Sequence, residues 1–224
     1  MPGDAPRRPY DSGRRREAAD RNRAAVLAAC RELFLRDGYR PTTVRAVAGR
    51  AGVSPETVYK AFGGKPGLLK ALWDVTLAGD DEPLTMAERP QLRQVLETPD
   101  PRVKLRLYAA FVRGVHERLA ALSALLAGAG PDAAEVLARS EEERLTGVTA
   151  FVAHLSATGA LPPGADLARL ADSCWTLTDP HPYTRLTADR GWSAEAYEDW
   201  LAGLLGAVLL EPPAGQARTA VDGG

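Results

Sequence analysis

The chain has 224 residues, of which 45% are hydrophobic and 25% charged, and its formal net charge is −1. This is the composition of an ordinary globular protein, and no apolar run approaches the roughly 20 residues that a membrane-spanning helix requires. The two cysteines, Cys30 and Cys174, both lie inside apolar helix patterns, so no disulfide framework is indicated and we expect a cytoplasmic protein.

Charge is distributed unevenly along the chain. Residues 1–65 contain 14 basic and 7 acidic residues, a net charge of +7, whereas residues 66–224 contain 14 and 22, a net charge of −8. A basic front portion on an acidic body is typical of a nucleic-acid-binding module joined to a second domain. A solvated excess of charge without a partner is the alternative interpretation.

The N-terminal segment, residues 1–17, is rich in Pro, Gly, Arg and Asp and lacks periodicity, which predicts a disordered basic arm. Its three consecutive arginines at residues 14–16 could reach a DNA minor groove, or the arm could have no partner. A helix is predicted from about residue 18 to Asp37, where Gly38 ends it. One face of this helix carries the apolar residues Val26, Cys30, Leu33 and Phe34.

The stretch from Thr42 to Lys65 has the pattern of two short helices joined by a tight turn. Thr42 or Thr43 can cap the first helix, and Gly52 can end it in a left-handed conformation. The second helix then begins with a Ser-Pro pair at residues 54–55. Its apolar residues Val58 and Phe62 point inward, whereas Thr57, Tyr59 and Lys60 remain exposed. This spacing predicts a helix-turn-helix, although a helical hairpin buried in a larger α-protein has the same pattern.

The remainder of the chain is predicted to be helical throughout. Residue 65 begins a fourth helix, and an acidic, proline-rich connector follows at residues 79–90. The later helices are predicted at residues 91–97, 102–128, about 131–158 and within 166–210. The fold class is therefore all-α. We predict three parts besides the N-terminal arm: a three-helix DNA-binding domain at residues 18–64, a helical bundle at 65–210 and a frayed tail at 211–224.

Residues from about 21 to 77 resemble the DNA-binding domain of the TetR family of bacterial transcription regulators. The similarity is carried by LFLRDGYRPTTV and VAGRAGVSPETVYKAFGGKPGLLKAL, which place several independent features at fixed offsets. The pair Gly63-Gly64 departs from the family pattern, and we expect it to loosen the second short helix relative to the fourth helix. The resemblance implies DNA contacts from Thr43, Arg45, Pro55, Glu56, Thr57, Tyr59, Lys60 and Lys65. Of these, Thr43, Tyr59 and Lys65 would bind phosphates, and the others would lie nearest base edges.

The same resemblance implies that the C-terminal bundle binds a small-molecule effector and pairs with a second copy of the chain. The candidate effector-binding residues are Tyr108, Phe111, His116, Phe151, His154 and Trp175. His116 and His154 lie on separate long helices and could face each other across a cavity. The candidate dimer-interface residues are Leu167, Leu170, Leu201, Leu204, Leu205 and Val208. Each of these side chains could instead be part of the core of a single protomer.

Enzyme classes find no support in the sequence. It contains no HExxH, no phosphate-binding glycine loop, no G-x-S-x-G and no Cys/His spacing for a metal, so no catalytic residue, metal or cofactor is expected. We therefore interpret the chain as a homodimeric transcriptional regulator, a repressor that leaves a palindromic operator when an effector binds. The alternatives are a helical protein-interaction scaffold and a small-molecule-binding enzyme. The sequence does not identify the effector, the operator or the regulated genes.

Overall fold

A computed structural model describes residues 12–210, and within that range all regular secondary structure is helical. The contacts divide the chain into two compact units, with the boundary between Asp74 and Val75. We refer to the described residues before this boundary as the N-terminal unit and to those after it as the C-terminal unit. The helical expectation for the fold is confirmed.

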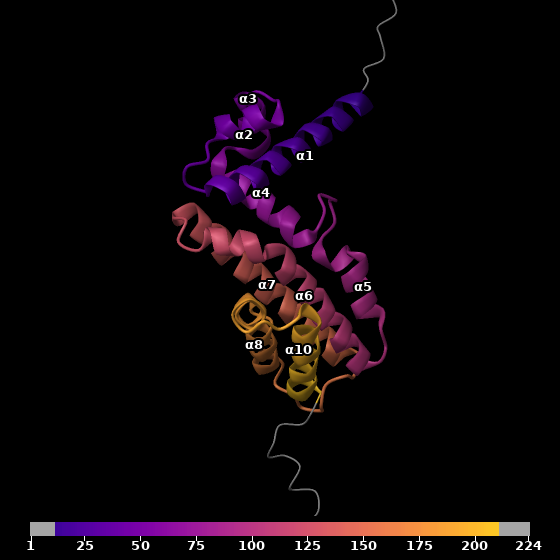
Figure 1. The fold of residues 1–224 in the computed structure, drawn as a ribbon. Coiled ribbons are helices and arrows are strands. Elements are labelled where there is room, and N and C mark those ends of the chain that lie inside the picture. Colours follow the sequence, from indigo (N-terminus) through magenta and orange to yellow (C-terminus); the bar gives the residue numbers. More distant parts are fainter. Residues whose placement is uncertain (1–11, 211–224) are drawn as a thin grey trace, which may run out of the picture. The chain divides into compact units, whose positions relative to one another are not determined.

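The N-terminal unit contains α1 (Ser12–Asp37), α2 (Val44–Ala51), α3 (Pro55–Phe62) and most of α4 (Lys65–Ala78) (Figure 1). Helix α2 packs against both α1 and α3. The side chains that hold these helices together are apolar and fully or almost fully buried, as the predicted helical stripes require. They include Val26, Cys30, Phe34, Val47, Ala48, Val58, Leu68 and Leu69.

Helix α1 begins at Ser12, about six residues before the predicted start, so residues 12–17 are helical and not disordered. Arg, Ala and Glu are good helix formers, and an existing helix is extended much more easily than a new one is nucleated. Glu17 also pairs with Arg21 one turn later, with 3.9 Å between carboxylate and guanidinium. The rest of the predicted arm, residues 1–11, and the predicted tail, 211–224, lie outside the described residues.

The unit boundary falls ten residues later than the predicted domain boundary after residue 64. The reason is that Leu68, Leu69 and Leu72, in the first half of α4, are buried in the N-terminal unit. The far end of α4 belongs to the C-terminal unit. There, Arg118 donates hydrogen bonds to the carbonyls of Thr76 and Leu77, at 3.2 and 2.8 Å, and so satisfies acceptors at the helix end.

The C-terminal unit is built around two long helices, α6 (Pro101–Leu126) and α7 (Pro131–Ala157). Helix α6 packs against α5 (Pro90–Glu97) and α10 (Ala194–Leu209), while α8 (Leu167–Leu177) packs against both α7 and α10. Three short elements complete the unit: η1 (Met86–Glu88), α9 (Pro180–Thr184) and the π-helical turn η2 (Arg185–Asp189). The long helices start and end within two residues of the predicted positions.

The core of the C-terminal unit is apolar and aromatic. Leu105, Leu155, Tyr197, Leu201 and Leu205 are among its fully buried side chains. Both cysteines of the chain are also buried, and burial raises the pKa of each thiol to about 12, so each remains protonated near neutral pH. Between Ser12 and Leu210, no helix combines the length and the apolar character needed to cross a membrane.

Candidate nucleic-acid interface and effector core

The turn between α2 and α3 is specified by its own residues. The hydroxyl of Thr43 accepts a hydrogen bond from the Ala46 N–H at 3.1 Å and caps α2, which Gly52 ends with a φ of +70°. The hydroxyl of Ser54 accepts from the Thr57 N–H at 3.2 Å and caps α3. Two eight-residue helices are therefore joined by a three-residue turn, which is the geometry of a helix-turn-helix.

Helix α3 separates its apolar and polar residues cleanly. Val58 is 0% exposed and Phe62 is 9% exposed, so these two side chains anchor the helix. On the opposite side Tyr59 is 56% exposed, and Thr57 and Lys60 are exposed as well. The structure thus excludes the buried hairpin, because the polar side of α3 is not covered by other described residues.

The predicted DNA-contacting residues differ in their solvent exposure. Thr43, Arg45, Glu56, Thr57, Tyr59 and Lys60 are exposed, whereas Pro55 and Lys65 are half-buried. The backbone N–H of Glu56 itself, followed by the Ser54 hydroxyl, holds the pKa of the Glu56 carboxyl below its ordinary value. Glu56 is therefore ionised at neutral pH. A carboxylate at this point can accept a hydrogen bond from a cytosine amino group but repels a phosphate.

Lys65 has a structural role that the sequence prediction missed. Its ammonium donates a hydrogen bond to the Arg40 carbonyl at 2.9 Å and lies 4.3 Å from the centre of the Tyr39 ring. These contacts tie the start of α4 to the loop between α1 and α2. Because the side chain is half-buried and held in this way, a phosphate contact by Lys65 would have to share its ammonium with the Arg40 carbonyl.

The connection between α3 and α4 is tight, contrary to the expectation that Gly63-Gly64 loosens it. Gly63 has a φ of +75°, and its N–H bonds to the Tyr59 carbonyl at 2.8 Å, so it caps α3. Gly64, with a φ of +125°, is buried beside the Tyr59 ring. In the next turn, a Cβ on Gly67 would lie 1.7 Å from the Phe62 carbonyl oxygen. Only glycine permits this close approach of α4 to the end of α3.

Three of the predicted effector-binding residues fill the core by stacking on one another. The rings of Tyr108 and Phe151 are stacked with 4.0 Å between their centres, and Phe111 stacks on Tyr108 at 6.2 Å. Tyr108 and Phe151 are buried, and Phe111 is half-buried. An effector that bound between the two rings would have to separate Tyr108 from Phe151.

His116 belongs to a different cluster, with Tyr183 and Tyr197. Its Nδ1 lies 3.3 Å from the Tyr197 hydroxyl, and it is also hydrogen-bonded to the backbone of Thr178. Burial, followed by the nearby charge of Arg144, lowers the pKa of His116 to about 4. The imidazole is therefore neutral at physiological pH and acts as a core hydrogen-bonding group.

His154 does not face His116. Its Nε2 lies 2.8 Å from the ammonium of Lys104 and 3.1 Å from the Leu96 carbonyl, which also accepts from Lys104 at 3.2 Å. Lys104 and His116 are twelve residues apart on α6, a separation of about 18 Å along a helix. The prediction that the two histidines face one another across a cavity is therefore wrong.

Trp175 has the most unusual environment of the six predicted residues. The guanidinium of Arg144 lies 4.7 Å from the centre of the indole ring and donates a hydrogen bond to the Trp175 carbonyl at 2.5 Å. The indole Nε1 is buried and has no hydrogen-bond partner among the described residues. An unpaired buried donor is costly, and a ligand acceptor that reached it would remove that cost. The sequence pattern did not assign Arg144 or Lys104 a role in this core, since their partners there, Trp175 and His154, are distant in the chain.

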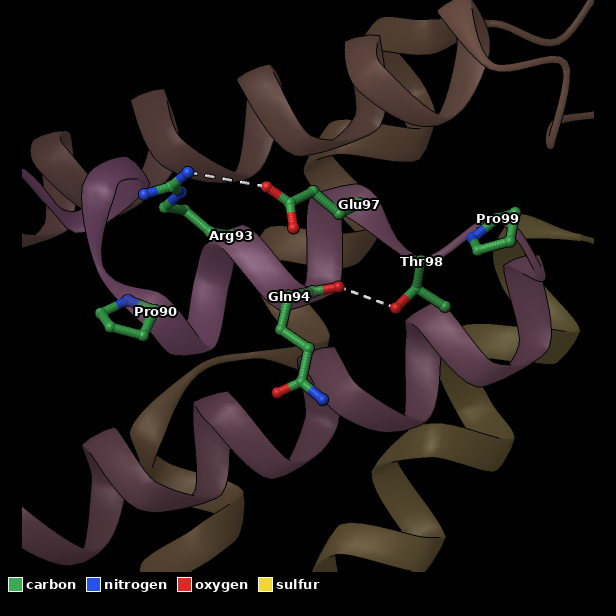
Figure 2. Close-up of a pocket in the computed structure, with 6 residues that line it drawn as sticks. All are labelled: Pro90, Arg93, Gln94, Glu97, Thr98 and Pro99. Carbon is green, nitrogen blue, oxygen red and sulfur yellow. Dashed lines mark hydrogen bonds and ion pairs between the residues drawn. The ribbon is translucent and has the colours of Figure 1, made fainter.

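A surface hollow of about 450 Å³ lies elsewhere in the C-terminal unit, on α5 and the loop after it (Figure 2). Four of its six lining residues are polar, and two of these, Arg93 and Glu97, form an exposed pair with 3.8 Å between guanidinium and carboxylate. None of the six predicted effector-binding residues lines this hollow. The lining residues are Pro90, Arg93, Gln94, Glu97, Thr98 and Pro99.

The predicted dimer-interface residues divide into two groups. Leu201 and Leu205 are 0% exposed and belong to the core of the protomer, so they have no surface to offer a second chain. We therefore remove them from the predicted interface, because this side of α10 faces the core of its own protomer. Leu167 is 39% exposed, and Leu170, Leu204 and Val208 are half-exposed. These four remain candidates.

Taken together, the capped helix pair, the exposed polar side of α3 and the separate helical body define a helix-turn-helix unit joined to a second helical unit. Residues 26–72 match the family model described as bacterial regulatory proteins, tetR family. The N-terminal unit of this chain is therefore similar to the DNA-binding domain of that family.

Known proteins resemble this chain at two levels. An uncharacterised HTH-type transcriptional regulator of Bacillus subtilis is 40% identical over 47 residues, which are 21% of this chain and 25% of that protein. The match thus spans only a quarter of the relative's length. NalD, the secondary repressor of a multidrug efflux pump in Pseudomonas aeruginosa, has a similar structure, with a TM-score of 0.63 and 20% identity over 87% of this chain and 98% of that one.

The regulator FadR of Bacillus subtilis, solved in complex with stearoyl-CoA, is similar as well. Its TM-score is 0.62, with 18% identity over 83% of this chain and 98% of that chain. Because both structural relatives have low identity to this chain, they establish the arrangement of its helices and not its ligand. The all-helical fold with an N-terminal helix-turn-helix is confirmed over nearly the whole chain.

Proposed function

We propose that this chain is a cytoplasmic transcriptional repressor that binds a near-palindromic DNA operator as a homodimer and leaves it when a small-molecule effector binds. The observation that carries the proposal is the exposed polar side of α3, where Thr57, Tyr59 and Lys60 stand out from a helix anchored by Val58 and Phe62. A short helix held in this way can enter the major groove of DNA without rearranging.

Contacts on this surface divide into positioning and readout. Thr43 and Tyr59 bind phosphates, which fixes the register of the protein but carries no sequence information. Arg45 and Lys60 are the cations that can pair with guanine, and Thr57 can contact a thymine methyl group. Glu56 adds a preference for cytosine, because its carboxylate is an acceptor. Specificity therefore depends mainly on Arg45, Lys60 and Glu56.

The dimer is proposed to form through α8 and α10. These two helices pack on each other, so their outward sides form one continuous face. That face carries Leu167, Leu170, Leu204 and Val208, and the small exposed residues Gly203 and Ala207 allow close approach of a second copy. Two copies related by a two-fold axis would present two α3 helices to two half-sites, which requires a near-palindromic operator.

The effector is proposed to enter the core between α6 and α7. Supporting this, the unpaired indole N–H of Trp175 offers a donor in the same core as the aromatic stack of Tyr108 and Phe151, and a structural relative has been solved with stearoyl-CoA. The effector must prefer the arrangement of the two units that does not fit DNA, since only a difference in affinity shifts the population. Separation of the Tyr108 and Phe151 rings is the local change that we expect.

Selection of bound duplexes from a random pool, followed by gel-shift titration, tests DNA binding. We expect enrichment of a two-fold-symmetric site and a steep loss of affinity with salt. Failure to discriminate the enriched site from random duplex DNA would contradict the proposal.

Sedimentation of two leucine variants tests the dimer. Leu204→Arg places a charge on the α8–α10 face and should give monomers. Leu145→Arg is the matched control, because Leu145 is 39% exposed on α7, outside α8 and α10. It should sediment as the unmodified protein does. Equal behaviour of the two variants would exclude this face as the interface.

A further inference from the structure

The first three turns of α1 form an exposed helical extension of the N-terminal unit. Over residues 13–25 only Ala18 and Arg23 are half-buried, and every other residue is exposed. In Figure 1 these turns project beyond α2 and α3. These turns add little to the packing of the unit, because the buried residues of α1 begin only at Val26. We call residues 12–23 the α1 extension.

The side of α1 that packs on the rest of the unit continues into the extension as arginine. Residues seven apart lie on nearly the same side of an α-helix, since seven residues are close to two turns. Cys30 on this side is fully buried. Seven residues earlier, Arg23 lies over the ring of Phe62, the last residue of α3, at 5.2 Å from the ring centre. Seven residues earlier again, Arg16 is exposed.

The charge of the extension is strongly positive. It contains five arginines, at residues 14, 15, 16, 21 and 23, against two acids. The two acids, Glu17 and Asp20, are three residues apart and therefore share one side of the helix. The remaining sides carry arginine, so the helix presents cations over most of its circumference. Arg23 places this charge immediately beyond the end of α3.

We propose that the α1 extension is a second DNA-binding element, which binds backbone phosphates of the duplex next to the bases read by α3. This inference rests on the proposed function, because it assumes that α3 binds DNA. The arginines of the extension are complementary to the phosphate backbone, and the contact of Arg23 with Phe62 makes the extension continuous with α3. As a helix extended from a packed segment, it holds its arginines at fixed spacing and does not act as a flexible arm.

Salt-dependent binding of full-length variants to the selected operator tests the inference. The triple variant Arg14→Gln, Arg15→Gln, Arg16→Gln removes three charges but retains the Glu17–Arg21 pair and Arg23. The slope of log affinity against log salt should become shallower by about 2 to 3 units, because each phosphate contact contributes about 0.9. The order of preference among operator sequences should not change, since phosphates carry no sequence information.

A control variant matches this one in charge. Arg102→Gln, Arg106→Gln, Arg190→Gln removes three exposed arginines from the C-terminal unit. Its salt slope should equal that of the unmodified protein. The inference is overturned if the two triple variants have the same salt slope. It is also overturned if substitution of the arginines at residues 14–16 changes the preferred flanking bases, which would mean minor-groove readout. If the unmodified protein itself fails to discriminate its site, the proposed function fails instead.

A proline variant separates a rigid helix from a flexible arm. Ala18→Pro keeps every charge but breaks the helix between Arg16 and Arg23, because proline lacks the N–H that bonds one turn back and its ring clashes there. The salt slope of this variant should become shallower, in the direction of the triple Gln variant. A slope equal to that of the unmodified protein would show that the arginines need no helix, and would overturn the rigid-element assignment.

Discussion

The two units of the molecule place their candidate functional side chains in opposite environments. In the N-terminal unit Thr57, Tyr59 and Lys60 are exposed on a helix whose anchors are purely apolar. In the C-terminal unit the candidate effector-binding residues are buried or half-buried, and Tyr108 and Phe151 among them contact each other. The proposed DNA contacts are therefore available on the N-terminal unit as it stands, whereas an effector at the proposed site would have to displace contacts that the C-terminal unit already makes.

This difference has an energetic consequence. DNA binding by the exposed side of α3 depends on the buried residues that hold α3 in place. Substitutions of those residues should therefore abolish DNA binding by unfolding the unit. Effector binding in the core requires contacts between buried side chains to break, and those contacts also stabilise the fold. Substitutions in the buried effector site should therefore lower the free energy of unfolding first. An effect on regulation should be measurable only in variants that remain folded.

The largest effect is expected for Gly67→Ala. The new Cβ would lie 1.7 Å from the Phe62 carbonyl oxygen, which is backbone and cannot move without shifting α3 or α4. We expect the free energy of unfolding to fall by about 3 kcal/mol, the upper end for an overpacked site. Chemical denaturation followed by circular dichroism measures this change, and operator binding should be lost in parallel.

Gly49→Ala is the matched control. A Cβ on Gly49, inside α2, has no neighbouring atom within 4 Å. The change should stabilise the protein by about 0.5 to 1 kcal/mol, because alanine favours the helix and glycine does not. Equal effects of the two substitutions would show that α4 does not depend on close approach to α3.

The next largest effect concerns His116 and acid stability. Its pKa is about 4 in the folded protein, below the value of about 6.5 for an unfolded chain, so folding favours the neutral imidazole. The stability that depends on neutral His116 is present above pH 6.5 and is lost as the pH falls from 6.5 towards 4. The loss should reach about 3 kcal/mol, because each tenfold difference in proton affinity between the folded and unfolded chain corresponds to about 1.4 kcal/mol.

Denaturation at a series of pH values tests this expectation with two variants. His116→Phe should lack the part of the acid destabilisation that lies between pH 6.5 and 4. His181→Gln should retain it, since the His181 side chain is 85% exposed. If His116→Phe loses stability with falling pH as steeply as the unmodified protein does, the histidine is not the group responsible.

The success of sequence-based prediction follows the same division between units. The caps at Thr43, Gly52 and Ser54 act over three or four residues, so a local pattern is enough to find them. In the C-terminal unit the decisive partners are far apart, as with Lys104 and His154, 50 residues apart, and His116 and Tyr197, 81 apart. Helical periodicity predicts that these side chains point inward but not which of them meet.

Two residues of the N-terminal unit were also missed by prediction from sequence. Gly67 was an unassigned position, although a glycine inside a helix costs about 1 kcal/mol relative to alanine and is a sign of close packing. Lys65 was expected to reach a phosphate, but its ammonium bonds to the Arg40 carbonyl. Both roles depend on where α4 lies against other segments, which a local pattern does not contain.

A smaller effect, on DNA choice, is expected for Lys60→Ala. Lys60 is exposed in the last turn of α3, so its removal should leave folding unchanged. Discrimination between the operator and a site with one changed base pair should fall by about 2 kcal/mol, within the range for a single base contact. Competition gel shifts with single-substitution operators measure it. If sequence preference stays the same, Lys60 is not a base-reading residue.

The smallest effect is expected for Tyr59→Phe, which removes only a hydroxyl group. The ring, which is 56% exposed and lies beside Gly64, should keep its position, so the change isolates the proposed phosphate contact. Binding to every DNA sequence should weaken by about 1 kcal/mol, the usual worth of one hydrogen bond, with no change in preference among sequences. Titrations against the operator and against random duplex DNA at one salt concentration measure both quantities. A loss confined to the operator would mean that Tyr59 reads a base, and the surface of α3 would then display more sequence readout than we assign to it.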